Sequence, residues 1–113
     1  MGRSFKNALI QLSYILKIDV DAFKNIQDTC KWYELHSKGL GLRYKTQTKK
    51  QINSLNKDPY LFSIKYGEIQ CRKIEKFPFL IHYLIDENAK TIAIFAVFHT
   101  SRNPEIWKTN LNK

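Results

Sequence analysis

The sequence predicts an α+β fold in which an N-terminal strand and a helical hairpin pack on a curled antiparallel sheet. Two neighbouring segments in the first half carry apolar residues at helical spacing. Segments rich in β-branched and aromatic residues follow, linked by short turn sequences. Because strands joined by short turns pair antiparallel, and helices that precede them pack on one face, these observations favour a helical hairpin on a sheet.

Residues 14–18 are short, apolar and β-branched, and we expect them to form the first strand. Residues 1–12 show no clear period, so we assign them to an N-terminal extension and residues 13–113 to a single domain. Asp19 or Asp21 can cap the next helix, because aspartate accepts hydrogen bonds from the free N–H groups of a first turn. The predicted core face of this helix consists of Phe23, Ile26, Cys30 and Tyr33.

The first helix is predicted to end near His36, and residues 39–41 (Gly-Leu-Gly) make the turn into a second helix. Glycine permits the positive φ that such a sharp connection requires. The second helix is predicted from about Leu42 to Leu55, before the stop at Pro59. Its apolar stripe consists of Tyr44, Thr48, Ile52 and Leu55, and its other face carries Arg43, Lys45, Lys49 and Lys50.

The second half of the chain is predicted to form consecutive strands and a short C-terminal helix. The strands are expected at residues 62–66, 69–74, 79–85 and 91–98. Asn103, Pro104 and Glu105 are typical of a helix start. Both faces of the last two strands are apolar, and the hairpin covers only one of them. The other face needs the C-terminal helix, the N-terminal extension or a separate chain, and the sequence leaves these alternatives open.

The composition indicates a small, basic protein with enough apolar residues for a core. The chain has 113 residues, a hydrophobic fraction of 43% and a formal net charge of +9. This excess of positive charge favours acidic partners such as nucleic acid or an acidic protein segment. The alternative is a basic surface that has no polyanion partner.

The sequence carries no sign of a cofactor, a metal site or a membrane segment. Cys30 and Cys71 lie among apolar neighbours and form no CxxC pair, so we expect reduced core residues and neither metal nor cofactor. The apolar runs are far shorter than the ~20 residues of a membrane span. We therefore expect a cytoplasmic protein that has no membrane partner.

The order of several short motifs resembles the RelE/ParE toxin family, in its ParE-like plasmid stabilisation branch. The resemblance covers residues 14–107. Its first half rests on residues 32–34 (Trp-Tyr-Glu), the turn at 39–44, and Asp58-Pro59 followed by Phe62. Its second half rests on Arg72-Lys73, residues 77–79 (Phe-Pro-Phe), residues 81–83 (Ile-His-Tyr), residues 92–97, His99, Arg102, Asn103, Pro104 and Trp107.

This resemblance implies the toxin of a type II toxin–antitoxin system, neutralised by a co-encoded antitoxin that wraps a disordered segment around it. Some family members inhibit DNA gyrase, and others cleave mRNA on the ribosome without a metal. The first activity is our expectation, and a RelE-like, ribosome-dependent mRNA endonuclease is the alternative. A basic RNA-binding domain without toxicity ranks last, because the chain lacks the exposed aromatic motif of an RNA-recognition sheet.

The candidate catalytic residues are Arg72, Lys73, His99 and Arg102. Cations can stabilise a charged phosphorane, and histidine exchanges protons near neutral pH. We expect the four to meet at one end of the sheet. The chain departs from the residue pattern of RelE-type nucleases at two positions. Leu80 stands where those nucleases carry an arginine, and Trp107 stands where they carry a tyrosine.

Structural roles for the four candidates are the alternative to catalysis. His99 would then form a hydrogen bond at a strand end, and Arg102 would brace the tail. Arg72 and Lys73 would be a solvated edge or an antitoxin contact.

Overall fold

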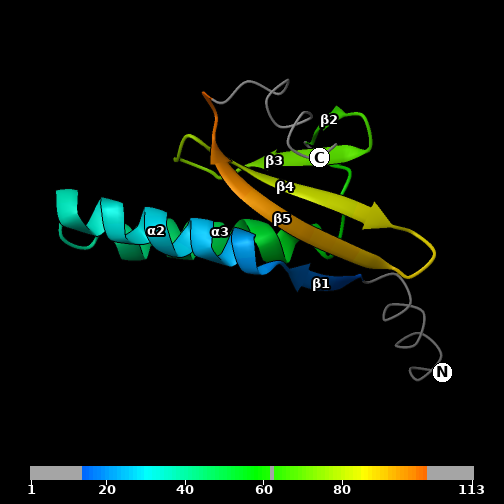
Figure 1. Cartoon of the computed structure of the whole chain (residues 1–113), viewed down its shortest axis with the longest axis horizontal. Helices are drawn as coiled ribbons and strands as arrows, with labels where there is room; N and C mark the ends of the chain where they lie inside the picture. The colour runs from blue at the N-terminus through cyan, green and yellow to red at the C-terminus, as the bar shows by residue number, and fades with distance from the viewer. Residues whose placement is uncertain (1–13, 62, 102–113) are drawn as a thin grey trace.

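The computed structural model describes residues 14–61 and 63–101, and confirms the predicted α+β fold. Two helices lie side by side against one face of a sheet (Figure 1). The predicted extension at residues 1–12, the predicted C-terminal helix and Arg102 lie outside the described residues. The elements are β1 (Ile15–Ile18), α2 (Val20–His36), α3 (Leu40–Leu55), β2 (Ile64–Tyr66), β3 (Ile69–Lys73), β4 (Phe79–Asp86) and β5 (Thr91–His99).

The sheet has the strand order β1-β5-β4-β3-β2. The strands from β2 to β5 follow one another through short turns and pair antiparallel, as predicted. By contrast, β1 pairs parallel with the first half of β5, from Ile15 opposite Thr91 to Ile18 opposite Ile94. The sheet is therefore mixed. A parallel pairing is possible here because the whole helical hairpin, rather than a tight turn, separates β1 from the later strands.

Asp19 begins α2 as its cap, with its carboxylate accepting a hydrogen bond from the Val20 N–H at 2.9 Å. The core face of the helix differs from the prediction at one position. Phe23 is 53% exposed, whereas Ala22 is fully buried. Ile26 and Tyr33 pack against the same core cluster as Ala22. The small Ala22 side chain occupies the centre of the contact face, and this rotates its neighbour Phe23 toward solvent.

The two glycines of the helical turn have different roles. Gly39 adopts a left-handed φ of +87°, which ends the turn, and α3 begins at Leu40, two residues earlier than predicted. Gly41 lies in the first turn of α3, where a Cβ would lie 2.6 Å from the Cys30 carbonyl oxygen of α2. The Glu34 carboxylate accepts hydrogen bonds from the N–H groups of Gly39 and Gly41, at 2.9 and 3.0 Å. The sequence Gly-Leu-Gly thus permits both the turn and the close helix crossing.

The predicted apolar stripe of α3 is buried against the sheet: Tyr44, Thr48, Ile52 and Leu55 are its buried side chains, together with Gly41. The Tyr44 ring is completely buried. It contacts the rings of Phe77 and Phe79 in edge-to-face geometry, with centroids 5.3 and 5.4 Å apart. These contacts connect α3 to the start of β4.

The second face of the sheet is also apolar, as predicted, but the regular alternation of side chains that a strand implies is interrupted in β5. A β-bulge interrupts the pairing, with His82 opposite Ala96 and Tyr83 opposite Ile94. The extra residue is Phe95, and it shifts the alternation by one position. Ile92, Ile94 and Val97 consequently face the helices. Phe95 and Phe98 pack on the other face, around Ile69, Cys71 and Leu80.

Candidate functional site

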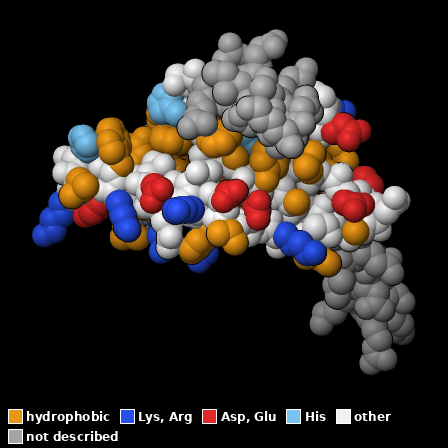
Figure 2. Space-filling view, viewed as in Figure 1, with side chains coloured by type: hydrophobic (Ala, Val, Ile, Leu, Met, Phe, Trp, Pro, Cys, Tyr) orange, Lys and Arg blue, Asp and Glu red, His pale blue; other side chains and the backbone are white. Residues whose placement is uncertain are grey.

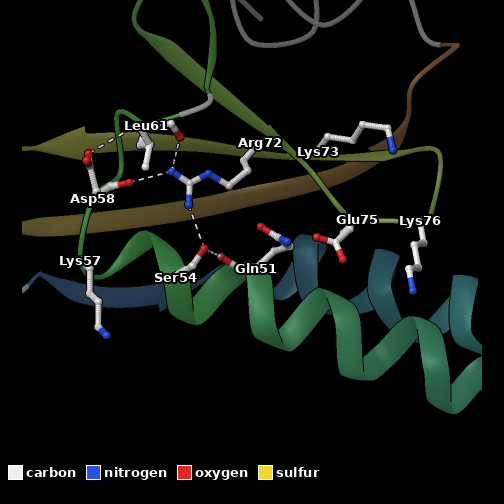
Figure 3. Close-up of a pocket in the computed structure, with 9 residues that line it drawn as sticks. All are labelled: Gln51, Ser54, Lys57, Asp58, Leu61, Arg72, Lys73, Glu75 and Lys76. Carbon is white, nitrogen blue, oxygen red and sulfur yellow. Dashed lines mark hydrogen bonds between the residues drawn. The ribbon is translucent and has the colours of Figure 1, made fainter.

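Arg72 lies in β3 and directs its guanidinium toward the end of α3 (Figure 3). Only 7% of its surface is exposed. One terminal nitrogen donates to the Ser54 hydroxyl at 2.8 Å, and the other donates to the carbonyl oxygens of Asp58, at 2.6 Å, and Leu61. Arg72 therefore joins the sheet to the segment that follows α3, and protein acceptors already occupy both of its terminal nitrogens.

Lys73 is the last residue of the same strand. Its strand partner is Leu80, which belongs to the apolar cluster away from the helices. Its ammonium group lies over the loop after β3, 3.4 Å from the Ile74 carbonyl oxygen and 3.3 Å from that of Phe77. The exposed ammonium can still contact an anionic partner.

His99 ends β5 opposite Phe79, whose ring it meets edge-to-face at 5.2 Å. Its Nδ1 accepts a hydrogen bond from the Ser101 N–H at 3.0 Å, and the Ser101 hydroxyl lies 2.9 Å from the same nitrogen. In the neutral ring this arrangement assigns the proton to Nε2. The exposed His99 can therefore donate a hydrogen bond through Nε2 to a ligand.

A cavity of about 470 Å³ lies beside His99, between α2 and the ends of β4 and β5. Its lining is mainly aromatic and consists of Asp28, Thr29, Trp32, Tyr33, Pro78, Phe79 and His99. Figure 2 shows hydrophobic side chains gathered above α2 in this view, with histidine side chains beside them. Trp32 is half-exposed there. The sequence does not predict a cavity at Trp32, because the position of this residue in a helix gives no sign of the strand ends that complete the cavity.

The expected cluster of Arg72, Lys73 and His99 is not assembled in the part of the chain that the structure describes. Lys73 and His99 do lie at the same end of the sheet, because their partners Leu80 and Phe79 are neighbours in β4. However, the Arg72 guanidinium is directed to the loop after α3 and the Lys73 ammonium to the loop after β3, although both residues line one hollow beside β3.

A second hollow, of about 580 Å³, lies between α3 and β3 (Figure 3). Its lining includes the cations Lys57, Arg72, Lys73 and Lys76 and the carboxylates Asp58 and Glu75. Lys76 has a left-handed φ of 71°, in the loop between β3 and β4. Sequence reasoning overlooked Lys57 and Lys76, because they lie in turns that carry no periodic pattern.

Cys71 is a free, buried thiol on the second face of the sheet. Its sulfur lies 3.1 Å from Nδ1 of the buried His82, and the Tyr66 hydroxyl lies 3.0 Å from the same nitrogen. Burial raises the pKa of the Cys71 thiol to about 12. The thiol therefore stays protonated at neutral pH, and it is not an activated nucleophile.

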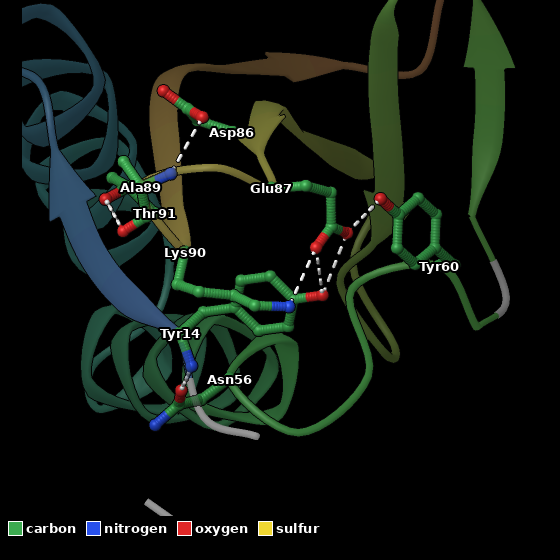
Figure 4. A network of polar contacts seen from close by, with 8 residues as sticks. All are labelled: Tyr14, Asn56, Tyr60, Asp86, Glu87, Ala89, Lys90 and Thr91. Atoms are coloured by element: carbon green, nitrogen blue, oxygen red, sulfur yellow. Dashed lines mark hydrogen bonds and ion pairs between the residues drawn. The ribbon is translucent and has the colours of Figure 1, made fainter. Parts of the chain in front are cut away.

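Glu87, in the turn between β4 and β5, accepts hydrogen bonds from two tyrosines and a lysine (Figure 4). The donors are the hydroxyl groups of Tyr60 and Tyr14, the latter at 2.9 Å, and the Lys90 ammonium at 3.0 Å. These bonds, that of Tyr60 first, lower the pKa of Glu87 to about 2. The group connects the residue before β1, the segment after α3 and the β4–β5 turn. We interpret it as a structural clasp.

Within residues 14–61 and 63–101, no three histidine, cysteine, aspartate or glutamate side chains gather to hold a metal ion. Neither of the two helices described is long and apolar enough to cross a membrane. The described residues offer exposed cations, a hydrogen-bonding histidine and an aromatic cavity.

Comparison of the chain with protein-family models identifies one that matches residues 16–104. Its description is the ParE toxin of the type II toxin–antitoxin system parDE. The match spans every helix and almost every strand residue described above. No curated protein sequence matches the chain significantly.

Solved structures share the fold at low sequence identity. A chain of the chromosomal ParDE TA system from P. aeruginosa superposes with a TM-score of 0.67 and 14% identity, covering 80% of this chain and 99% of that one. A chain of the toxin–antitoxin complex RelBE2 from Mycobacterium tuberculosis gives 0.57 and 13%, covering 80% and 95%. A chain of the intact E. coli RelBE toxin–antitoxin complex gives 0.57 and 16%, covering 80% and 100%. At these identities the likeness establishes a common fold.

Proposed function

The chain belongs to the ParE toxin family of type II toxin–antitoxin systems, and from this premise we propose that it inhibits DNA gyrase by binding and is neutralised by a co-encoded antitoxin. Gyrase acts on DNA in the bacterial cytoplasm, and the proposal places the toxin there. Inhibition by binding requires an exposed, complementary surface but no acid–base chemistry of the toxin itself.

The hydrogen bonding of Arg72 is the observation that carries this proposal. Metal-independent RNA cleavage needs cations on the phosphate and an acid or base at the same site. The terminal nitrogens of Arg72 already bind Ser54, Asp58 and Leu61. Moreover, Leu80 stands where the nuclease branch carries an arginine, and the Lys73 ammonium lies over the loop after β3 rather than with the Arg72 guanidinium. This arrangement supports a binding toxin rather than an endonuclease.

A bound antitoxin segment is supported by an apolar surface at the start of the domain, which we call the β1–α2 surface. It consists of Ile15, Ile18, Val20 and Phe23, whose exposed fractions run from 44% for Ile18 to 76% for Val20. These side chains are close together in the chain, and an exposed apolar patch usually marks a binding surface. The similar ParDE and RelBE structures are those of toxin–antitoxin systems and complexes. We therefore assign the antitoxin segment to the β1–α2 surface.

Purified toxin, released from its antitoxin, provides the test. We expect it to block DNA supercoiling by gyrase and to leave ribosome-bound mRNA intact when mRNA ends are mapped. Addition of the antitoxin should restore supercoiling. If gyrase stays fully active and new mRNA ends appear only when ribosomes are present, the endonuclease alternative replaces our proposal. His99 and Lys73, at the same end of the sheet, would then be the first residues to assign.

A further inference from the structure

We propose that the outer face of α3 binds the phosphate backbone of double-stranded nucleic acid. We define this face by four exposed cations, Arg43, Lys49 and Lys50 within the helix and Lys57 just after it. The proposal goes beyond gyrase inhibition and antitoxin binding, because it concerns residues that are absent from the β1–α2 surface.

The charge of α3 is one-sided. The helix contains Arg43, Lys45, Lys49 and Lys50 and no aspartate or glutamate. Acidic and basic side chains alternate along α2, by contrast, as the view onto that helix shows (Figure 2). The ion pair found among the described residues joins Lys90 to Glu87, so no described carboxylate neutralises a cation of α3. Unpaired like charges on one face repel one another, and a bound polyanion would offset that repulsion.

The spacing of the cations fits an extended anionic strand. Arg43 and Lys50 are seven residues apart, which places them on one side of α3, about 10.5 Å apart along the helix axis, and Lys57 follows just after the helix end. A shallow hollow on α3 is lined by Lys45, Lys49 and Lys50, together with Leu42, Thr46 and Asn53. Duplex DNA presents one phosphate charge per ~1.7 Å of its axis, so a row of this length can contact several phosphates.

Lys76 extends the same basic surface across the loop before β4. It lines a hollow beside Arg43 and also lines the hollow that contains Lys57. Figure 3 shows Lys57 and Lys76 at opposite ends of the hollow that both residues line. Asp58 and Glu75 also line it, so we place the phosphates over the helix rather than deep in the hollow.

The side chains of α3 favour nucleic acid over an acidic protein. Protein interfaces are enriched in aromatic residues at their centre and depleted of lysine. On α3, Leu42 is the exposed large apolar side chain, and the Tyr44 ring is buried. Interfaces with nucleic acid are polar and strongly positive. Single strands also require aromatic platforms on which bases stack. Since α3 presents none, a duplex is the occupant that fits.

The test is fluorescence anisotropy with the full chain and a labelled DNA duplex, repeated over a range of salt concentrations. The variant Lys49→Gln/Lys50→Gln removes two cations from the outer face of α3. Its matched control, Lys24→Gln/Lys31→Gln, removes two exposed lysines from α2. Each phosphate contact contributes about −0.9 to the slope of log K against log salt on duplex DNA. We therefore expect the first variant to flatten this slope by about 1.8, and the control to keep the wild-type slope.

Circular dichroism should show that both variants keep the wild-type melting temperature, so that any change in slope reports on binding. Equal slopes for the two variants would overturn the proposal, because binding would then follow net charge alone. Tighter binding of a single strand, or of a polyglutamate peptide, than of the duplex at the same salt concentration would also overturn it. A wild-type chain that binds no duplex even at low salt concentration would do the same.

Discussion

The Cα of Gly41 in α3 approaches α2 so closely that a Cβ built on it would lie 2.6 Å from the carbonyl oxygen of Cys30. Real Cβ atoms essentially never come so near a heavy atom, and backbone cannot move aside as a flexible side chain can. We expect Gly41→Ala to destabilise the fold by roughly 1–3 kcal/mol, because the helices must separate to admit the methyl group. Urea unfolding measures the change. The control is Lys45→Ala, an exposed position in the same helix, and an equally stable Gly41→Ala would refute the close crossing.

Arg72→Met should cost about 3 kcal/mol of folding free energy. The substitution keeps an apolar stem of similar length but leaves the Asp58 and Leu61 carbonyl oxygens without their donor. Lys73→Met, one residue later on the exposed end of β3, should change stability by less than about 0.5 kcal/mol. Chemical unfolding of both variants measures the difference. Equal stability of the two variants would mean that the hydrogen bonds of Arg72 contribute little to the folding free energy. The Arg72 guanidinium would then again be a candidate for phosphate binding.

Glu87→Gln tests the clasp through its dependence on pH. Because the folded pKa of Glu87 is lowered to about 2, the carboxylate adds stability that is fully present above its ordinary pKa. This contribution is lost as the pH falls from about 5 toward 2. We expect the wild type to lose more stability than Glu87→Gln over that range. Thermal unfolding at a series of pH values gives the comparison, with Glu68→Gln, exposed in the β2–β3 turn, as the control. Parallel curves for wild type and Glu87→Gln would exclude the clasp.

The sequence predicts the helices and strands closely, since their signals are local. The core stripe of α3, from Tyr44 to Leu55, follows from a spacing that any helix imposes. The bulge at Phe95 has no such signature, because it depends on the register with β4. The clasp at Glu87 escaped prediction for a similar reason, as its tyrosine partners lie 27 and 73 residues away in the chain.

The candidate site was harder to predict than the fold. Arg72 and Lys73 are consecutive residues of a strand, and the alternation of side chains already implies opposite faces. The sequence therefore predicts that the two side chains diverge. It does not predict the acceptors that bind Arg72, because two of them are backbone carbonyls of a turn, at Asp58 and Leu61. A backbone acceptor leaves no trace in residue type, so a buried arginine of this kind resembles a catalytic one in sequence.

Phe23→Ser tests the β1–α2 surface as the contact for the antitoxin. The substitution removes a half-exposed aromatic ring without opening the core, so the free toxin should keep its melting temperature. Loss of such an apolar anchor commonly costs more than about 1 kcal/mol of binding. Co-purification with the product of the neighbouring reading frame should therefore weaken at least about fivefold. The control is Lys24→Ser, the next residue of the helix. Unchanged antitoxin binding by Phe23→Ser would move the contact elsewhere.

His99→Asn separates the binding toxin from the endonuclease. Asparagine retains a hydrogen-bonding group at the strand end but cannot exchange a proton near neutral pH. If the protein acts by binding gyrase, the variant should inhibit growth within a few-fold of the wild type, because no step requires proton transfer. If His99 acted as an acid or base on RNA, its loss would reduce cleavage about 10²–10⁴-fold. Growth after induction and mapping of mRNA ends, measured in the same cultures, distinguish these results.

A parallel variant, Trp32→Leu, keeps the imidazole but removes the indole from the cavity beside it. Reduced toxicity in both variants without new mRNA ends in the wild type would place the gyrase contact at this cavity. Loss of toxicity in His99→Asn alone, with ribosome-dependent cuts by the wild type, would contradict the binding proposal.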